Sequence, residues 1–152
     1  MPKAAVIMGS SSDMEIMKSA AEVLGSMSID HKVFVMSAHR QPEKVHAFCT
    51  AARAEGYEVI IAGAGAAAHL PGVIASWTTL PVIGVPIPSS ALNGVDSLYA
   101  IVQMPAGVPV ATMAIGSAGA KNAAYFAAQM LGLKYPEIAS AYEHFRSGLK
   151  SS

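Results

Sequence analysis

The chain has 152 residues and a formal net charge of zero, with 10 basic and 10 acidic side chains. This balance argues against bulk electrostatic attraction to nucleic acid or to an anionic membrane. Charged residues make up only 13% of the sequence and hydrophobic residues 53%. Apolar runs of about ten residues are too short to span a bilayer. We therefore expect a single domain over residues 1–152 that associates with itself through apolar surfaces.

The N-terminus and the cysteine content bear on where the protein works. The first apolar run, residues 4–8, is too short for the hydrophobic segment of a secretory signal. The single cysteine, Cys49, forbids an intrachain disulfide and fits a reducing compartment. We therefore expect a cytoplasmic protein in which Cys49 is a small core or interface residue.

Stretches with the apolar pattern of strands alternate along the chain with stretches that have the spacing of helices. The strands are expected at residues 4–8, 31–36, 59–62, 80–85 and 108–115. The helices are expected at residues 14–26, 42–55, 71–77, 94–103 and 118–131, followed by a C-terminal helix at about 137–150. This alternation predicts an α/β fold with a doubly wound parallel sheet. Right-handed crossovers place the loops that follow the strands at one edge, where such sheets bind ligands.

The loop after the first strand runs from Gly9 through three serines to Asp13 and opens a helix. Glycine allows close backbone approach, while hydroxyls and free amides donate to an anion near the positive end of the helix. Ser10 is therefore a candidate ligand contact. Asp13 does not suit phosphate binding, so it either caps the helix or accepts hydrogen bonds from ligand hydroxyls. The loop lacks the Gly-Lys-Ser/Thr of a Walker motif.

The loop after the second strand is Ser37-Ala38-His39-Arg40. It follows an apolar run, residues 33–36, that we interpret as a buried strand, and it precedes Pro42, which opens a helix. His39 can move protons near neutral pH, and Arg40 offers a planar fork for phosphate or carboxylate. Taken alone, the pair also suits purely structural roles: Arg40 would cap the loop, and His39 would make one structural hydrogen bond.

The loop after the third strand consists of small residues: Gly63-Ala64-Gly65-Ala66-Ala67-Ala68-His69-Leu70-Pro71-Gly72. Its start matches the dinucleotide pattern G-x-G-x-x-[GA], but residues 80–92 contain no acid to bind a ribose, so we reject that interpretation. A loop without bulky side chains suits a flat ligand lying against Gly65 and Ala66. His69 either contacts that ligand, orients His39, or caps the helix that begins at Pro71.

These three loops and residues 94–109 (GVDSLYAIVQMPAGVP) resemble the bacterial N5-carboxyaminoimidazole ribonucleotide mutase family of purine biosynthesis. The resemblance extends over about residues 4–131, with the motifs in the same order and spacing. It implies a flavodoxin-like fold, a three-layer α/β/α sandwich, that assembles as a homo-octamer and uses no cofactor or metal. Two positions differ from the usual pattern: Met14 stands where Trp is common, and Ala66 where some relatives have Gly.

The resemblance also implies a reaction and a set of roles. The reaction interconverts N5-carboxyaminoimidazole ribonucleotide and 4-carboxy-5-aminoimidazole ribonucleotide, so the partner is a small nucleotide rather than nucleic acid or membrane. Carried over by motif, Ser10, Asp13, Ser37 and Arg40 would hold ribose and phosphate, and His39 would carry the proton.

The residues suit this chemistry. Protonation of the carbamate nitrogen releases CO2, ring carbon C4 attacks the trapped CO2, and C4 then loses its proton. One group whose pKa lies near the operating pH can give the first proton and take the second, and His39 fits this role. The small-residue loop, with Leu70 nearby, fits a dry pocket that keeps CO2 from water.

Two other classes of function stay open at the level of sequence. The chain could be a flavodoxin-like carrier of a flavin or nucleotide, or a non-catalytic oligomeric scaffold. Within the family, the nearest alternative is the related carboxylase that uses free CO2 and aminoimidazole ribonucleotide. The overall likeness of the motifs favours the mutase.

Overall fold

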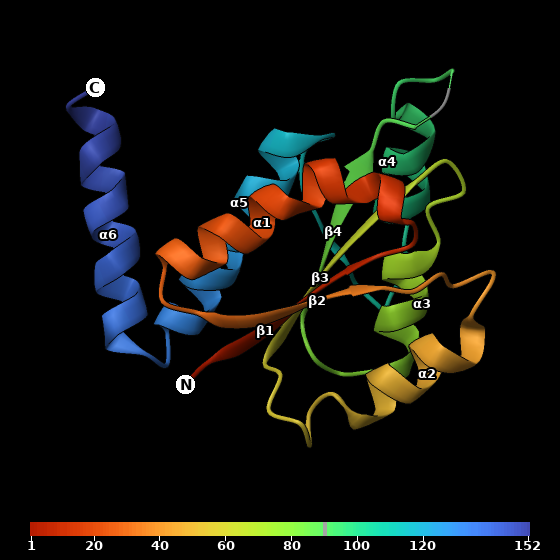
Figure 1. Cartoon of the computed structure of the whole chain (residues 1–152), viewed down its shortest axis with the longest axis horizontal. Coiled ribbons are helices and arrows are strands. Elements are labelled where there is room, and N and C mark those ends of the chain that lie inside the picture. Colours follow the sequence, from red (N-terminus) through yellow and green to blue (C-terminus); the bar gives the residue numbers. More distant parts are fainter. Residues whose placement is uncertain (90) are drawn as a thin grey trace.

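A five-stranded parallel sheet forms the centre of the molecule, seen in a computed structural model that describes residues 1–89 and 91–152 (Figure 1). The strands, in the spatial order β2-β1-β3-β4-β5, are β1 (Lys3–Met8), β2 (Asp30–Val35), β3 (Val59–Gly65), β4 (Val82–Ile87) and β5 (Ala111–Thr112). The helices are η1 (Ser11–Asp13, a 3-10 turn), α1 (Met14–Ser26), α2 (Pro42–Ala51), α3 (Leu70–Trp77), α4 (Val95–Val102), α5 (Ser117–Gly132) and α6 (Pro136–Lys150).

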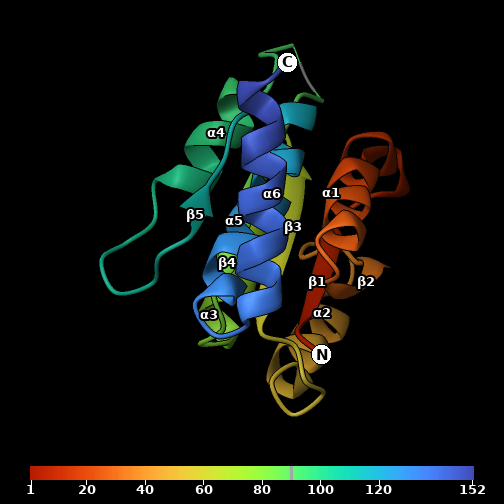
Figure 2. The ribbon, with the colours of Figure 1, turned by 90° about the vertical axis from the view of Figure 1, so that its left-hand side faces the viewer.

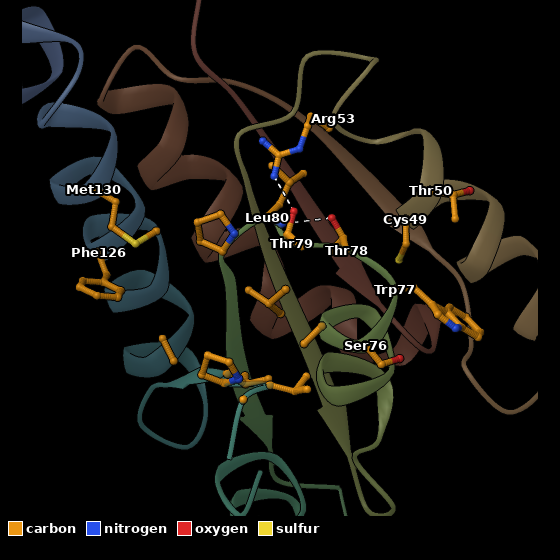
Figure 3. Close-up of a pocket in the computed structure, with 18 residues that line it drawn as sticks. Cys49, Thr50, Arg53, Ser76, Trp77, Thr78, Thr79, Leu80, Phe126 and Met130 are labelled. Atoms are coloured by element: carbon orange, nitrogen blue, oxygen red, sulfur yellow. Dashed lines mark hydrogen bonds between the residues drawn. The ribbon is translucent and has the colours of Figure 1, made fainter. Parts of the chain in front are cut away.

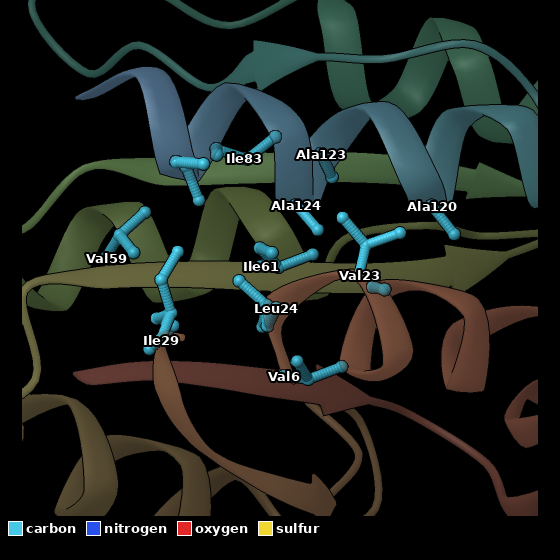
Figure 4. Close-up of a cluster of buried hydrophobic side chains, with 14 of the residues drawn as sticks. Val6, Val23, Leu24, Ile29, Val59, Ile61, Ile83, Ala120, Ala123 and Ala124 are labelled. Atoms are coloured by element: carbon cyan, nitrogen blue, oxygen red, sulfur yellow. The ribbon is translucent and has the colours of Figure 1, made fainter. Parts of the chain in front are cut away.

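Helices α1 and α5 cover one face of the sheet. Their apolar side chains interlock with those of the strands: Val23 and Leu24 of α1 and a row of alanines of α5 pack against Val6, Ile61 and their neighbours (Figure 4). The alanines at 120, 123, 124, 127 and 128 are fully buried. Because alanine is small, α5 can approach both α1 and the sheet closely.

Helices α2, α3 and α4 cover the opposite face. Val45 and Cys49 of α2, Ile74 of α3 and Ile101 of α4 are buried in a second cluster with the strand residues that point to that side. The two covered faces make a three-layer α/β/α sandwich of the flavodoxin-like type, as expected. Along the described part of the chain, no helix combines the length and apolar character that crossing a bilayer requires.

The C-terminal helix α6 lies outside this sandwich and packs against α5, where Figures 1 and 2 show it running along the flank of the molecule. The turn before it is tied to the start of β3. The Glu58 carboxylate accepts hydrogen bonds from the Tyr135 hydroxyl (2.6 Å) and the Lys134 ammonium (3.1 Å). Burial tends to raise the pKa of Glu58, but these two hydrogen bonds outweigh it and hold the pKa below its ordinary value.

The second strand differs from the expected buried strand. β2 lies at the edge of the sheet, and its apolar residues Val33 and Val35 remain 39% and 37% exposed. An apolar run alone cannot distinguish a central strand from an edge strand, whose outer backbone groups pair with no neighbouring strand. The strand also begins one residue earlier and ends one residue earlier than residues 31–36.

Several element lengths also differ from the expected ones. β3 continues to Gly65, which still pairs with Ile87 of β4. Its small residues leave room for α1, since a Cβ at Gly63 would overlap the Met17 sulfur. β5 shrinks from the expected 108–115 to two residues, since Pro109 cannot donate to a ladder. Pro86 fits into β4 because the pairing between β4 and β5 ends at Gly84, before Pro86 is reached. The N–H that proline lacks is therefore not needed for a ladder hydrogen bond on that side. Helix α2 stops at Ala51, and irregular turns lead to the left-handed Gly56.

Candidate active site

A cleft of about 300 Å³ opens at the carboxyl ends of the strands, where the loops after β1, β2, β3 and β4 converge. This is the edge at which the sequence placed the ligand site. The residues that line it come from all four loops: Gly9, Ser10, Ser12, Asp13, Ser37, Ala38, His39, Arg40, Ala64, Gly65, Ala67, Leu70 and Ser89. Seven of the nine residues expected in the site therefore line one cleft; the other two, Ala66 and His69, do not line it.

The β1 loop presents a cluster of hydroxyls to the cleft. Ser10 takes an extended backbone conformation before η1, and its hydroxyl accepts a hydrogen bond from the Ser12 amide (3.3 Å). The Ser10 and Ser12 hydroxyl oxygens lie 2.9 Å apart. A ligand at this point meets a small set of adjustable donors and acceptors at the start of the η1–α1 segment.

Asp13 is a buried acid on the floor of this loop, only 8% exposed. Its carboxylate makes no capping hydrogen bond to α1 within the described structure, so the helix-cap interpretation is wrong for the side chain. Burial raises the pKa of Asp13 above its ordinary value, against the opposing effect of a backbone hydrogen bond from Ser10. A desolvated carboxylate that lines a cleft and caps no helix is a natural acceptor for ligand hydroxyls.

The β2 loop is a compact turn held by Ser37. The Ser37 hydroxyl accepts from the Arg40 amide (3.1 Å), and its carbonyl accepts from the Gln41 amide (2.9 Å). This turn lifts Arg40 to the rim of the cleft. Among the residues that the structure describes, no hydrogen bond or ion pair engages the Arg40 guanidinium, whose fork is therefore available to an anion.

The two histidines of the site are in direct contact. His39 Nε2 lies 2.9 Å from His69 Nδ1, and the rings meet edge to face at 90° with their centroids 5.0 Å apart. One of these nitrogens must carry the proton and the other must accept it, so the tautomer of one ring fixes that of the other. His69 makes no side-chain cap for α3 in the described structure, so of its three expected roles the contact with His39 is the one that the geometry displays.

The β3 loop brings backbone rather than side chains to the cleft. A Cβ at Gly65 would overlap the Ser89 hydroxyl and lie 2.8 Å from the Ser89 Cβ, so only glycine fits here. Ala66 adopts a left-handed conformation (φ 48°) and does not line the cleft itself, although its neighbours Gly65 and Ala67 do. Leu70, the first residue of α3, supplies an apolar wall.

Ser89 is a lining residue that the sequence interpretation missed. It lies in the turn-rich stretch 86–94, of which Ser90 falls outside the described residues. The signal that could have identified Ser89 is topological: it follows the end of β4, next to β3 in the sheet, and loops after neighbouring parallel strands meet at one edge.

A second, larger hollow of about 1110 Å³ lies at the opposite edge of the sheet, by the amino ends of β4 and β5 (Figure 3). Apolar side chains such as Trp77, Phe126 and Met130 line it, and Arg53 donates to the Thr79 hydroxyl (2.8 Å) at its rim. Burial raises the pKa of the Cys49 thiol to about 11, so this thiol stays protonated at neutral pH. The cleft holds a histidine backed by a second histidine, a buried acid and a free guanidinium, so it is the site equipped for chemistry.

The AIR carboxylase family model matches residues 3–152. An N5-carboxyaminoimidazole ribonucleotide mutase of Pyrococcus abyssi is 56% identical over 150 residues, covering 99% of this chain and 85% of that protein. The enzyme of the same name from Aquifex aeolicus is 61% identical over 138 residues, covering 91% and 81%. In the crystal structure of Treponema denticola PurE, the matching chain is 28% identical, has a TM-score of 0.90 and covers 99% of this chain and 93% of its own. A sequence match over almost the whole chain thus accompanies a fold match of the same extent, and the chain belongs to the AIR carboxylase family.

Proposed function

We propose that this protein is an N5-carboxyaminoimidazole ribonucleotide mutase of purine biosynthesis. It converts that nucleotide into 4-carboxy-5-aminoimidazole ribonucleotide by moving a carboxyl group from the exocyclic nitrogen to ring carbon C4. The observation that carries the proposal is a histidine, His39, in one cleft with a free guanidinium and a buried carboxylate. Relatives named N5-carboxyaminoimidazole ribonucleotide mutase, which are identical to this chain at more than half of the aligned positions, support it.

Substrate binding is assigned to the side chains of the first two loops. Arg40 and the hydroxyls of Ser10 and Ser37 hold the phosphate and ribose, because a free planar fork and nearby hydroxyls match phosphate oxygens. Asp13 accepts hydrogen bonds from the ribose hydroxyls. The imidazole lies flat against the Gly65 backbone beside Leu70, where side chains leave room for a planar ring.

His39 carries the proton. It first donates a proton to the carbamate nitrogen, and the C–N bond then breaks to give CO2 and aminoimidazole ribonucleotide. The electron-rich C4 attacks the trapped CO2 and forms a new C–C bond. His39 then removes the C4 proton, which restores the aromatic ring, so the enzyme ends in the protonation state in which it began.

His69 acts through His39. Its Nδ1, 2.9 Å from His39 Nε2, holds the His39 ring in one orientation and accepts or returns a proton as the state of His39 changes. The apolar Leu70 and the alanines of the third loop limit water near the bound CO2, which would otherwise escape or hydrate.

Assembly as a homo-octamer and a cytoplasmic location belong to the same proposal, as does a single functional domain over residues 1–152. The low charge content and the apolar side chains left exposed on α4 and β2 support self-association. We assign no metal or cofactor to the chain's own chemistry. Over residues 1–89 and 91–152, no three His, Cys, Asp or Glu side chains cluster as metal ligands would.

A direct comparison of two substrates tests the proposed function. Purified protein is mixed with N5-carboxyaminoimidazole ribonucleotide without added bicarbonate, and separately with aminoimidazole ribonucleotide and bicarbonate. The proposal predicts rapid formation of the 4-carboxy product in the first mixture. Turnover only in the second mixture would identify a carboxylase that uses free CO2. Turnover in neither, with a tightly bound flavin in the purified protein, would identify a carrier.

A further inference from the structure

The wall of the cleft formed by Ser89 depends on where β4 ends. Ile87, the last residue of β4, is paired with Gly65, the last residue of β3. Ser89 follows two residues later and packs against Gly65 so closely that a Cβ there would overlap its hydroxyl. A displacement of Ile87 would therefore move Ser89 and the Gly65 backbone, which together form one side of the cleft.

A buried serine on α4 fixes this strand end. Ser97 is fully buried, at 0% exposure, and its hydroxyl donates a hydrogen bond to the Ile87 carbonyl at 3.0 Å. The ladder between β3 and β4 ends at the Gly65–Ile87 pair, so a side chain rather than a further strand residue supplies this donor. A buried carbonyl that loses its donor is costly, so the bond restrains the strand end strongly.

Helix α4 packs closely on β4. Its Ile101 is fully buried and fills the space above Gly84, where a Cβ would lie 2.5 Å from the Ile101 Cγ2. Its N-cap, Gly94, takes a left-handed conformation (φ 90°) and closely approaches Ile115 and Pro88. Ser97 thus donates to Ile87 from a helix that packs closely on the same strand.

We propose that Ser97 is a positioning residue for the cleft: its hydroxyl holds the end of β4 so that Ser89 and Gly65 form the surface against which the substrate's imidazole lies. The inference rests on the proposed function for its substrate. Ser97 does not itself line the cleft, so it acts through Ile87 and Ser89. Because His39 belongs to the β2 loop, loss of the Ser97 bond affects substrate binding more than proton transfer.

The alternative is that Ser97 only satisfies a buried carbonyl and contributes to stability. Ser26 provides a control for the loss of a serine hydroxyl: it is exposed rather than buried, and its hydroxyl donates to the Val23 backbone carbonyl (2.7 Å) near the C-terminal end of α1. Ser97→Ala and Ser26→Ala each remove one hydroxyl from one such bond. Ser97→Cys retains a weak donor in a somewhat larger side chain, and it is the second variant should Ser97→Ala fold poorly.

The test measures KM, kcat and amide hydrogen exchange for the parent, Ser97→Ala, Ser97→Cys and Ser26→Ala. Ser97→Ala should raise KM by about tenfold, which corresponds to ~1.4 kcal/mol of lost binding free energy, and change kcat far less. Ser97→Cys should lie between the parent and Ser97→Ala. Peptides covering residues 82–89 should exchange faster in Ser97→Ala, while those of α1 should not change. Ser26→Ala should leave KM at the parental value.

A parental KM in Ser97→Ala, together with parental exchange over residues 82–89, would overturn the inference. So would equal rises in KM for Ser97→Ala and Ser26→Ala, because a general loss of stability would then explain both. The exchange measurement needs no substrate. If the parent itself shows no turnover, the proposed function fails, and the exchange of residues 82–89 still decides whether Ser97 fixes the end of β4.

Discussion

His39 and His69 form a hydrogen-bonded pair in which neither ring can change its proton without affecting the other. A proton carrier that serves two steps of one reaction needs a fixed orientation between them, and a second ring in edge-to-face contact supplies it. At the scale of single residues, the proposal therefore concentrates the chemistry on His39 and its orientation on His69.

Replacing His39 with Asn tests this assignment, because Asn is close in shape to the imidazole but cannot shuttle a proton at neutral pH. His39→Asn should fold and bind nucleotide like the parent while kcat falls by at least the ~10²–10⁴-fold attributed to acid–base catalysis. His46→Asn is the control: His46 stacks edge to face on Trp77, away from the cleft. A His39→Asn enzyme that keeps more than about a tenth of parental kcat would contradict the assignment.

His69→Asn should lower kcat less than His39→Asn does, because His69 acts only through its neighbour. The double variant should be about as slow as His39→Asn alone, since residues that act as a unit are not additive. Independent, additive losses would show that His69 contacts the substrate by itself.

Asp13 is predicted to bind the ribose rather than to stabilise the fold. Its pKa is raised by burial, so the charged form is disfavoured on folding and costs stability at pH values above its folded pKa. Asp13→Asn should therefore melt no lower than the parent at neutral pH. Its affinity for the nucleotide should fall by about 1.5–3 kcal/mol, the range for a hydrogen bond to a charged group. Calorimetric titration and thermal melting separate the two effects; unchanged affinity with a lower melting temperature would refute the role.

The sequence predicted which residues enter the site better than it predicted their partners. Ser10, His39 and Gly65 follow three strands that are easily recognised, and topology alone brings their loops together. The hydrogen bond between His39 and His69 joins residues 30 positions apart, and no pattern in the sequence encodes their distance. Ser89 was missed because the turn-rich loop after the fourth strand carries no motif that singles out one residue, although its place after β4 puts it at the same edge of the sheet.

At the scale of elements, the central strands and the long helices followed from apolar periodicity, whereas the sheet edges did not. β1 and β3 are buried on both faces, so their continuous apolar runs predict their position in the middle of the sheet. β2 and β5 are edge strands whose extent depends on neighbours: β5 ends where no further strand continues the ladder, and β2 keeps exposed apolar residues. Pairing partners, rather than intrinsic propensity, decide the length of an edge strand.

The hydrogen bonds that Lys134 and Tyr135 donate to Glu58 join the turn before α6 to the start of β3, and they should make the free energy of unfolding depend on pH in the acidic range. The pKa of Glu58 lies below its ordinary value near 4.5, so its carboxylate contributes stability above that value and loses it as the pH falls through the folded pKa. Glu58→Gln should therefore flatten the fall in melting temperature between about pH 5 and pH 3. Glu22→Gln, on the exposed side of α1, is the control. A Glu58→Gln profile parallel to that of the parent would show that the link contributes nothing.

At the scale of the whole molecule, the single chain leaves an apolar surface exposed along α4. Leu92, Val95, Tyr99 and Val102 follow helical spacing along α4 and its approach, and they are 61%, 44%, 61% and 46% exposed. A short helix with apolar residues on its outer as well as its inner side is typical of a buried element. We therefore expect this face to be covered in the assembled protein.

Light scattering at micromolar concentration should show one assembly much larger than the 15.6 kDa chain, in keeping with the proposed octamer. Stable interfaces of this kind commonly bury more than about 2,000 Å² in total. Tyr99→Glu should shift the protein toward smaller species, because a buried, unpaired charge is costly. Lys18→Glu, on the charged outer side of α1, should not. A monodisperse monomer for the parent would contradict self-association.

The proposed mutase mechanism requires that the carboxyl group move within one cleft, through CO2 that does not exchange with solvent. The most direct measurement follows N5-carboxyaminoimidazole ribonucleotide labelled with carbon-13 in its carboxyl group, in the presence of excess unlabelled bicarbonate. If CO2 stays in the cleft, the label is retained on the carboxyl group at C4 of the product. A product that carries the unlabelled carboxyl group would show that CO2 enters from solution, and it would contradict the mutase mechanism.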